Sequence, residues 1–245
     1  GLARVACPHV EASEAVAVIA VVVIDTADDQ LASSLRAFND QSYAELQWVF
    51  LVTPAASSAD PEGFAGVTRR LRDHVPGSVV RPLENDTTSR VAAANAVVDI
   101  VDGARGLFWF CDAHTVPARD ALAHLVTELQ RSNAGIVGPK LVDATDRRRL
   151  ITVGAGADRF GTQQPVTEPG ETDQEQHDAV RDVFVLSTRS LLIRADLFQE
   201  IGGFDPSVAD GGEDLDICWR AHLAGARVVV VPEAVVADRR GLSFE

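Results

Sequence analysis

Residues 17–24, AVIAVVVI, followed at once by Asp25, decide the fold class of this chain. An uninterrupted apolar run rich in β-branched residues predicts a strand that is buried on both faces. A helical pattern follows over residues 31–39, and a second apolar strand is expected over residues 47–52. The order strand, helix, strand predicts parallel strands joined by a crossover helix, the repeating unit of α/β folds.

The same alternation continues along the rest of the chain. Further strands are expected at 78–82, 106–111, 135–141, 183–186, 191–194 and 227–231, further helices at 64–73, 90–101, 118–133, 196–201 and 214–224, and a loop at 53–61. We therefore expect one α/β domain over residues 1–245, with a Rossmann-like, mostly parallel central sheet and helices on both faces.

Residues 143–182 differ from the rest because they are polar, glycine-rich and highly charged. This composition predicts an insertion of loops and short strands. One interpretation is a solvated surface loop. The alternative is a lid or binding loop, since long loops inside compact domains are usually functional.

Composition excludes several classes of protein. The chain has 36 acidic and 22 Lys or Arg residues, a formal charge of −14, which argues against a nucleic-acid-binding surface. Its longest apolar run, residues 15–24, is too short for the ~20 residues of a membrane-spanning helix. The 3 cysteines lie far apart, which favours reduced thiols in a soluble domain. Because the 245 residues contain no Met, we expect a piece of a longer protein whose other parts contact the membrane.

The triplet Asp112-Ala113-His114 directly follows the apolar strand at 106–111. In an extended chain the side chains at positions i and i+2 point to the same face, so a carboxylate and an imidazole can hold one divalent cation together. Mixed oxygen and nitrogen ligands suit Mn²⁺ better than Mg²⁺. As an isolated triplet, the pattern is more typical of a chance pair at a strand end.

A second acidic motif, Glu213-Asp214, follows two glycines and precedes a helical pattern. The structural interpretation makes Asp214 the N-cap of the helix and Glu213 a solvated neighbour. The functional interpretation makes this turn the place where an acid is presented to a cleft.

In their order and spacing, these motifs resemble the family-2 glycosyltransferases, which are inverting enzymes of the GT-A fold. The likeness is to the rhamnosyltransferase-like branch and to the large actinobacterial membrane glycosyltransferases, and it spans nearly the whole chain. The segments that carry it are Asn95-Ala96, Phe108 to Pro117, Val137 to Lys140, Gly202 to Asp205, Gly212 to Asp216 and Ala224 to Val228.

The resemblance implies transfer of a sugar from a nucleoside diphosphate sugar, with inversion, to a glycan or lipid-linked acceptor. It places the domain on the cytoplasmic face of a membrane, in cell wall biogenesis. By the same resemblance, residues 1–141 form the nucleotide-sugar-binding half and residues 142–245 the acceptor and catalytic half.

The resemblance also implies roles for single residues. Asp214 is the expected catalytic base, with Glu213 beside it. Asp112 is expected to contact the nucleotide or a divalent metal (Mn²⁺ or Mg²⁺), and His114 to bind that metal. Asp238 stands where many relatives have a His, either as a third metal ligand or as an exposed loop acid.

The donor-site motifs depart from the family pattern. Asp25-Thr26-Ala27-Asp28 replaces the usual turn after the first strand, and no Asp-Gly-Ser pattern follows the second strand, where Thr53 stands. We expect Asp25, Thr53 and Asn95 to contact the nucleotide instead. The alternative is a catalytically degenerate GT-A domain that serves as a binding or scaffolding module. A dinucleotide oxidoreductase is disfavoured, because no G-x-G-x-x-G motif follows the first strand.

Overall fold

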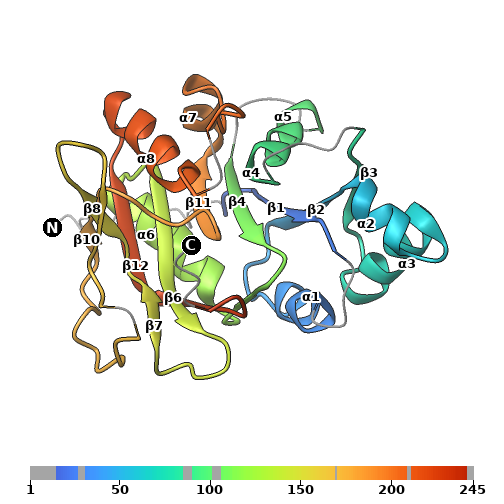
Figure 1. Cartoon of the computed structure of the whole chain (residues 1–245), viewed down its shortest axis with the longest axis horizontal. Helices are drawn as coiled ribbons and strands as arrows, with labels where there is room; N and C mark the ends of the chain where they lie inside the picture. Colours follow the sequence, from blue (N-terminus) through green and yellow to red (C-terminus); the bar gives the residue numbers. More distant parts are fainter. Residues whose placement is uncertain are drawn as a thin grey trace, which may run out of the picture.

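A computed structural model describes residues 15–26, 31–84, 90–100, 106–168, 170–208 and 211–241 (Figure 1). Its strands are β1 Val18–Ile24, β2 Leu46–Val52, β3 Val79–Pro82, β4 Leu107–Asp112, β5 Thr115–Pro117, β6 Ile136–Asp143, β7 Leu150–Thr152, β8 Ala155–Ala157, β9 Gln163–Pro165, β10 Arg181–Asp182, β11 Ser190–Arg194 and β12 Val228–Asp238. Its helices are α1 Leu31–Asn39, α2 Pro54–Ala59, α3 Gly63–His74, α4 Arg90–Ala93, the 3₁₀ turn η1 Ala94–Ala96, α5 Val97–Ile100, α6 Ala121–Ser132, α7 Ala195–Glu200 and α8 Glu213–Leu223.

The main sheet runs in the order β10-β12-β6-β11-β4-β1-β2-β3. Strands β4, β1, β2 and β3 are parallel to one another, and β6 is parallel to β12. Strand β11 joins the two parallel groups, because it is antiparallel to both β4 and β6. The sheet is therefore mixed but mostly parallel, and the α/β prediction is confirmed.

Helices cover both faces of the sheet (Figure 1). Side chains alternate along β1, so Ala20 and Val22 pack with α1, α3 and α6, whereas Val21 and Val23 face the core shared by η1, α7 and α8. Both faces of β1 are therefore buried, and this explains why apolar residues occupy every position of the run. Among the described helices, none is long and apolar enough to cross a bilayer.

The structure corrects two of the expected elements. Residues 54–59 form helix α2 rather than a loop, because the Thr53 hydroxyl accepts a hydrogen bond from the Ala56 amide at 3.2 Å and Pro54 occupies the first turn. Residues 183–186 do not form a strand. Their amides instead donate to Val228 O, Ala155 O and Cys218 Sγ, so this apolar segment is buried without a regular ladder.

Two other elements differ in extent. The final strand was expected at 227–231, but β12 runs on to Asp238 through a register shift between Val231 and Val235. The helix expected at 90–101 is divided into α4, η1 and α5 over the described residues 90–100. The insertion at 143–182 consists of loops and the short strands β7 to β10, as expected.

Candidate active site

Three of the predicted site residues lie at one edge of the sheet. Strands β1, β2 and β4 are parallel, with Ile24 paired to Val52 and Val23 paired to Asp112. Asp25, Thr53 and Asp112 therefore lie at the carboxyl ends of neighbouring strands. Ligands in open α/β sheets bind outside this edge.

Thr53 has a structural task that the sequence did not indicate. Its hydroxyl caps α2, and its amide donates to Ile24 O at 3.0 Å, which fixes the ends of β1 and β2 together. Contact of Thr53 and Asp25 with a nucleotide remains a prediction.

The turn at Ser187–Arg189, just before β11, connects the two acidic motifs. The Thr188 amide donates to Asp214 Oδ1 at 2.7 Å, and the Arg189 carbonyl accepts from the Asp112 amide at 2.9 Å. Two consecutive residues of one turn thus hold Asp112 and Asp214, although these acids lie 102 positions apart in the sequence (214 − 112).

Asp214 lies in the first turn of α8 and faces a cavity. Burial raises the pKa of its carboxyl group, and hydrogen bonds from Thr188 and Ser187 and the charge of Arg189 oppose that shift. The N-cap of α8 is Gly212, so the expectation that Asp214 caps the helix is wrong. Glu213 accepts a hydrogen bond from the Gly211 amide at 2.6 Å.

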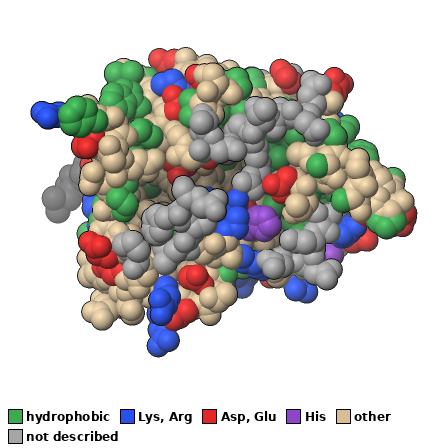
Figure 2. Space-filling view, in the orientation of Figure 1, with side chains coloured by type: hydrophobic (Ala, Val, Ile, Leu, Met, Phe, Trp, Pro, Cys, Tyr) green, Lys and Arg blue, Asp and Glu red, His purple; other side chains and the backbone are tan. Residues whose placement is uncertain are grey.

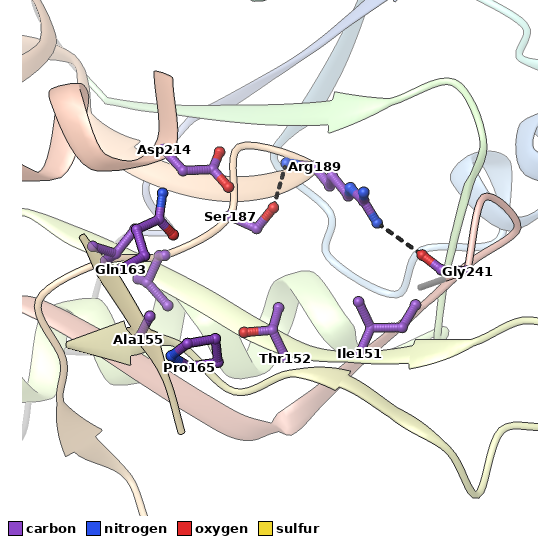
Figure 3. Close-up of a pocket in the computed structure, with 11 residues that line it drawn as sticks. Ile151, Thr152, Ala155, Gln163, Pro165, Ser187, Arg189, Asp214 and Gly241 are labelled. Atoms are coloured by element: carbon purple, nitrogen blue, oxygen red, sulfur yellow. Dashed lines mark hydrogen bonds between the residues drawn. The ribbon is translucent and has the colours of Figure 1, made fainter. Parts of the chain in front are cut away.

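The cavity has a volume of about 160 Å³ and is bounded by the 187–189 turn, by α8 and by the insertion. Figure 3 shows Asp214, Ser187 and Arg189 on one side and Ile151, Thr152 and Pro165 opposite them. The complete lining is Ile151, Thr152, Ala155, Gln163, Pro165, Val185, Leu186, Ser187, Arg189, Asp214 and Gly241. The insertion therefore forms one wall of the candidate site.

Two carboxylates expected to bind metal are instead paired with arginines. Asp238, the last residue of β12, is 0% exposed, and its Oδ2 accepts from Arg189 Nη1 at 2.8 Å. The interpretation of Asp238 as an exposed loop acid is therefore wrong. Asp112 Oδ2 accepts from Arg240 Nη2, while Asp112 Oδ1 accepts from the His114 amide at 2.9 Å.

The residues present do not fit a divalent metal well. Within the described part of the chain, no group of three His, Cys, Asp or Glu side chains is close enough to hold a metal ion. A cation bound by Asp112 and Asp238 would also have to displace a guanidinium group from each carboxylate. The expected ligand set of Asp112, His114 and Asp238 is thus not gathered into a metal centre.

His114 lies in the short connection between β4 and β5, and its carbonyl accepts from the Arg239 amide at 3.3 Å. Figure 2 shows Lys or Arg side chains beside a histidine near the middle of the drawn face. The end of β12 therefore brings basic residues to the edge where β4 ends.

Asn95 holds the turn at 202–205 in place. Its side-chain amide donates to Phe204 O at 2.7 Å and its oxygen accepts from Phe204 N at 2.8 Å. Gly203, at φ +70°, lies so close that an added Cβ would be 2.6 Å from Asn95 Oδ1. Both polar atoms of the Asn95 side chain thus serve the fold, whereas its expected contact with a nucleotide remains a prediction.

Replacement of Asn95 separates these two roles. We expect Asn95→Ala to lower the free energy of unfolding by about 2 kcal/mol, because two hydrogen bonds are lost and the Phe204 backbone groups are left unsatisfied. Asn95→Asp keeps the acceptor for the Phe204 amide but places a carboxylate oxygen against Phe204 O, where the native side chain donates, so its loss should be no smaller. Denaturant titration measures both. If Asn95→Ala were as stable as the native chain but bound nucleotides more weakly, the residue would act on the ligand instead.

Sequence reasoning missed Ser187, Thr188, Arg189 and Arg240. A signal for the first three was available, since a polar Ser-Thr-Arg run directly precedes an apolar strand, as Asp112 directly follows one. Their partners were not predictable, because these lie on α8 and β12 and the contacts depend on the strand order.

The fold is that of the GT-A glycosyltransferases. Three solved glycosyltransferase structures share the fold. GalNAc-T7 with UDP, GalNAc and Mn²⁺ matches with a TM-score of 0.72 and 16% identity over 95% of this chain and 45% of that chain, and S. aureus TarS with a TM-score of 0.65 and 13% identity over 91% of this chain and 36% of that chain. The mannosyltransferase PcManGT from Pyrobaculum calidifontis with GDP-Man and Mn²⁺ matches with a TM-score of 0.64 and 18% identity over 95% of this chain and 59% of that chain.

The chain belongs to the family described as glycosyltransferase like family 2, whose model matches residues 16–245. It is also similar to the pre-mycofactocin glycosyltransferases of two Mycobacterium tuberculosis strains, CDC 1551 / Oshkosh and ATCC 25618 / H37Rv, each 26% identical over 130 residues. Each match covers 52% of this chain and 26% of the relative, so the chain spans about a quarter of the length of those proteins.

Proposed function

We propose that this chain is the catalytic domain of an inverting glycosyltransferase, which transfers a sugar from a nucleoside diphosphate sugar to a hydroxyl group of a glycan or lipid-linked acceptor. One observation carries the proposal: the Asp214 carboxylate faces a cavity and is tied through Thr188 and Arg189 to Asp112 at the carboxyl edge of the sheet. An acid with a raised pKa in a cavity is well suited to accept a proton.

In the proposed reaction Asp214 takes the proton of the acceptor hydroxyl group. The acceptor oxygen forms a bond to the anomeric carbon, the bond from that carbon to the diphosphate oxygen breaks, and its electron pair leaves with the diphosphate. Attack from the face opposite the leaving group inverts the configuration. Positioned base catalysis contributes about 10²- to 10⁴-fold to such steps.

The two halves of the domain then have different tasks. Residues 1–141 would bind the donor at the carboxyl ends of β1, β2 and β4, with Asp25, Thr53 and Asn95 near the nucleotide. Residues 142–245 would receive the acceptor, since Thr152 and Gln163 of the insertion share the cavity with Asp214. A lipid-linked acceptor and a place on the cytoplasmic face of a membrane, within a longer protein of cell wall biogenesis, belong to the same proposal.

A binding or scaffolding module is the second candidate. It is favoured by the lost nucleobase motif and by Thr53, whose hydroxyl already caps α2. Such a module could hold a nucleotide sugar without transferring it.

A panel of UDP-, dTDP- and GDP-sugars distinguishes the two candidates. For a transferase we expect slow hydrolysis of at least one donor, measured as released nucleoside diphosphate, together with thermal stabilisation. A ligand at 100 times its dissociation constant stabilises a protein by about 2.7 kcal/mol. Stabilisation without hydrolysis would favour a binding module. A folded sample that shows neither with any donor would contradict the transferase and leave a scaffolding module.

A further inference from the structure

Two ion pairs lie where a family-2 glycosyltransferase was expected to bind its metal. Arg189 pairs with Asp238, and Arg240 pairs with Asp112. The pairs are joined, because Asp238 Oδ1 also accepts from the Arg240 amide at 2.8 Å and Arg189 Nη1 also donates to Gly241 O at 3.3 Å (Figure 3).

We infer that Arg189 and Arg240 supply the positive charge for the diphosphate of the donor, so that this domain binds nucleoside diphosphates without a divalent cation. The inference rests on the proposed function. Asp112 and Asp238 then serve as positioning residues that hold the two guanidinium groups.

The charges of the site support this assignment. A divalent cation held by two carboxylates forms a neutral unit, and two guanidinium groups held by the same two carboxylates also form a neutral unit. The arginines thus replace the charge of the metal in full. A cation added to the occupied site would meet two positive groups at short range, which is unfavourable.

In both ion pairs the carboxylate lies deeper in the protein than the arginine that it binds. The side chains of Asp238 and Asp112 are 0% and 8% exposed, whereas those of Arg189 and Arg240 are 24% and 30% exposed. A carboxylate this deeply buried requires a cationic partner, so each guanidinium group is fixed by its carboxylate while part of the arginine side chain stays exposed to solvent.

The location and chemistry of the arginines fit a phosphate ligand. Arg189 lines the cavity that contains Asp214, and Arg240 is attached to the strand edge at which donors are expected. A guanidinium group is planar, always charged and able to bind two phosphate oxygens at once, and it needs no accompanying ion. Negative charge on the leaving diphosphate would be stabilised by groups that are already in place.

Calorimetric titration of the whole chain with UDP, GDP and dTDP tests the inference. We expect at least one of these to bind in EDTA with a dissociation constant that changes less than about twofold when Mn²⁺ replaces the chelator. Each charge-assisted hydrogen bond lost should weaken binding about tenfold or more. We expect that loss for the double variant Arg240→Gln with Asp112→Asn, which removes both charges of the pair and leaves no buried carboxylate without its partner.

Removal of Arg189 alone would leave a buried carboxylate without its partner and can prevent folding. The double variant Arg189→Gln with Asp238→Asn removes both charges together and is expected to fold and to bind nucleotide at least tenfold more weakly. Arg194→Gln is the matched control. Arg189 directly precedes β11, whereas Arg194 is the last residue of that strand, at its other end, and pairs with Asp196 on the surface, so nucleotide affinity should stay unchanged.

The outcomes separate the inference from the proposed function. Binding only in the presence of Mn²⁺ overturns the arginine assignment and leaves a metal-dependent transferase. Full affinity in both arginine variants also overturns the assignment and leaves the proposed function in place. No binding with or without Mn²⁺ overturns the proposed function, and the inference with it.

Discussion

Asp214→Asn is expected to reduce kcat for glycosyl transfer by about 10²- to 10⁴-fold, the contribution of a positioned general base. The asparagine oxygen can still accept the Thr188 amide, so the turn at 187–189 keeps its place. KM for the donor should change little, because the donor is bound at the strand edge. The measurement is steady-state kinetics with the donor identified in the panel.

The same replacement should increase stability. Burial raises the pKa of Asp214 in the folded state, so at any pH above that pKa the ionised carboxyl group costs folding free energy. The cost decreases as the pH falls through the folded pKa and is gone below the unfolded pKa. At pH 7 we therefore expect Asp214→Asn to melt at a higher temperature than the native chain. A large loss of kcat with a lower melting temperature would indicate structural damage instead.

Protonation of Asp214 should also determine the acidic limb of the pH profile. A base must be ionised, so kcat should fall as the pH drops through the raised pKa, with a midpoint above the ordinary value of 3.8.

Asp216→Asn is the matched control for both readouts. Asp216 is on the same helix, and its carboxylate pairs with Arg220, which also donates to Ile201 O and Gly203 O. Loss of this pair should lower the melting temperature slightly and leave kcat within a few-fold. Equal losses of kcat in both variants would show that general damage to α8, and not loss of the base, explains the effect.

Lys140→Met is expected to lower the free energy of unfolding by about 2 kcal/mol, because hydrogen bonds to two charged groups are lost while Asp173 and Asp178 remain partly exposed. Lys140 on β6 is 4% exposed, and its Nζ donates to Asp173 Oδ2 at 2.7 Å and to Asp178 in the insertion. Both carboxylates would lose their buried partner. A change of this size corresponds to a fall of roughly 4–8 °C in Tm for a chain of this length.

The pH dependence of the native pair has a defined sign. Burial lowers the pKa of Lys140, but the hydrogen bonds and charges of Asp173 and Asp178 outweigh it, so the net shift is upward. A lysine with a raised folded pKa contributes its full stabilisation below the unfolded pKa and loses it only as the pH rises through the folded pKa. The Lys140→Met effect should therefore be complete at pH 7.

Arg227→Gln is the control for Lys140→Met, because Arg227 also contacts the insertion, through Asp182, but its side chain is 49% exposed. Exposed pairs contribute about 0–1 kcal/mol, so only a small loss is expected. Increased proteolysis within 143–182 in Lys140→Met alone would show that the buried lysine holds this wall of the cavity. Equal stability of the two variants would contradict the argument.

Patterns local in the sequence predicted much of the fold. The buried run at 17–24 and the helical spacing at 31–39 and 214–224 each depend on neighbouring residues, so they can be recognised without tertiary information. The prediction of a strand at 183–186 was wrong because this segment depends on residues that are distant in the sequence. Its apolar residues are buried, but its backbone groups bond to Ala155, Val228 and Cys218, which only the folded chain brings near.

The sequence by itself determined which residues could carry chemistry: acids at strand ends and at the start of a helix. Only the tertiary structure decided their partners. Asp112 and Asp238 hold Arg240 and Arg189, because β11 inserts antiparallel between β4 and β6 and β12 ends beside the β4–β5 connection. The physical reason is that a carboxylate has the same sequence signature whether it binds a metal, a guanidinium group or water, and only burial and strand order determine which cation reaches it.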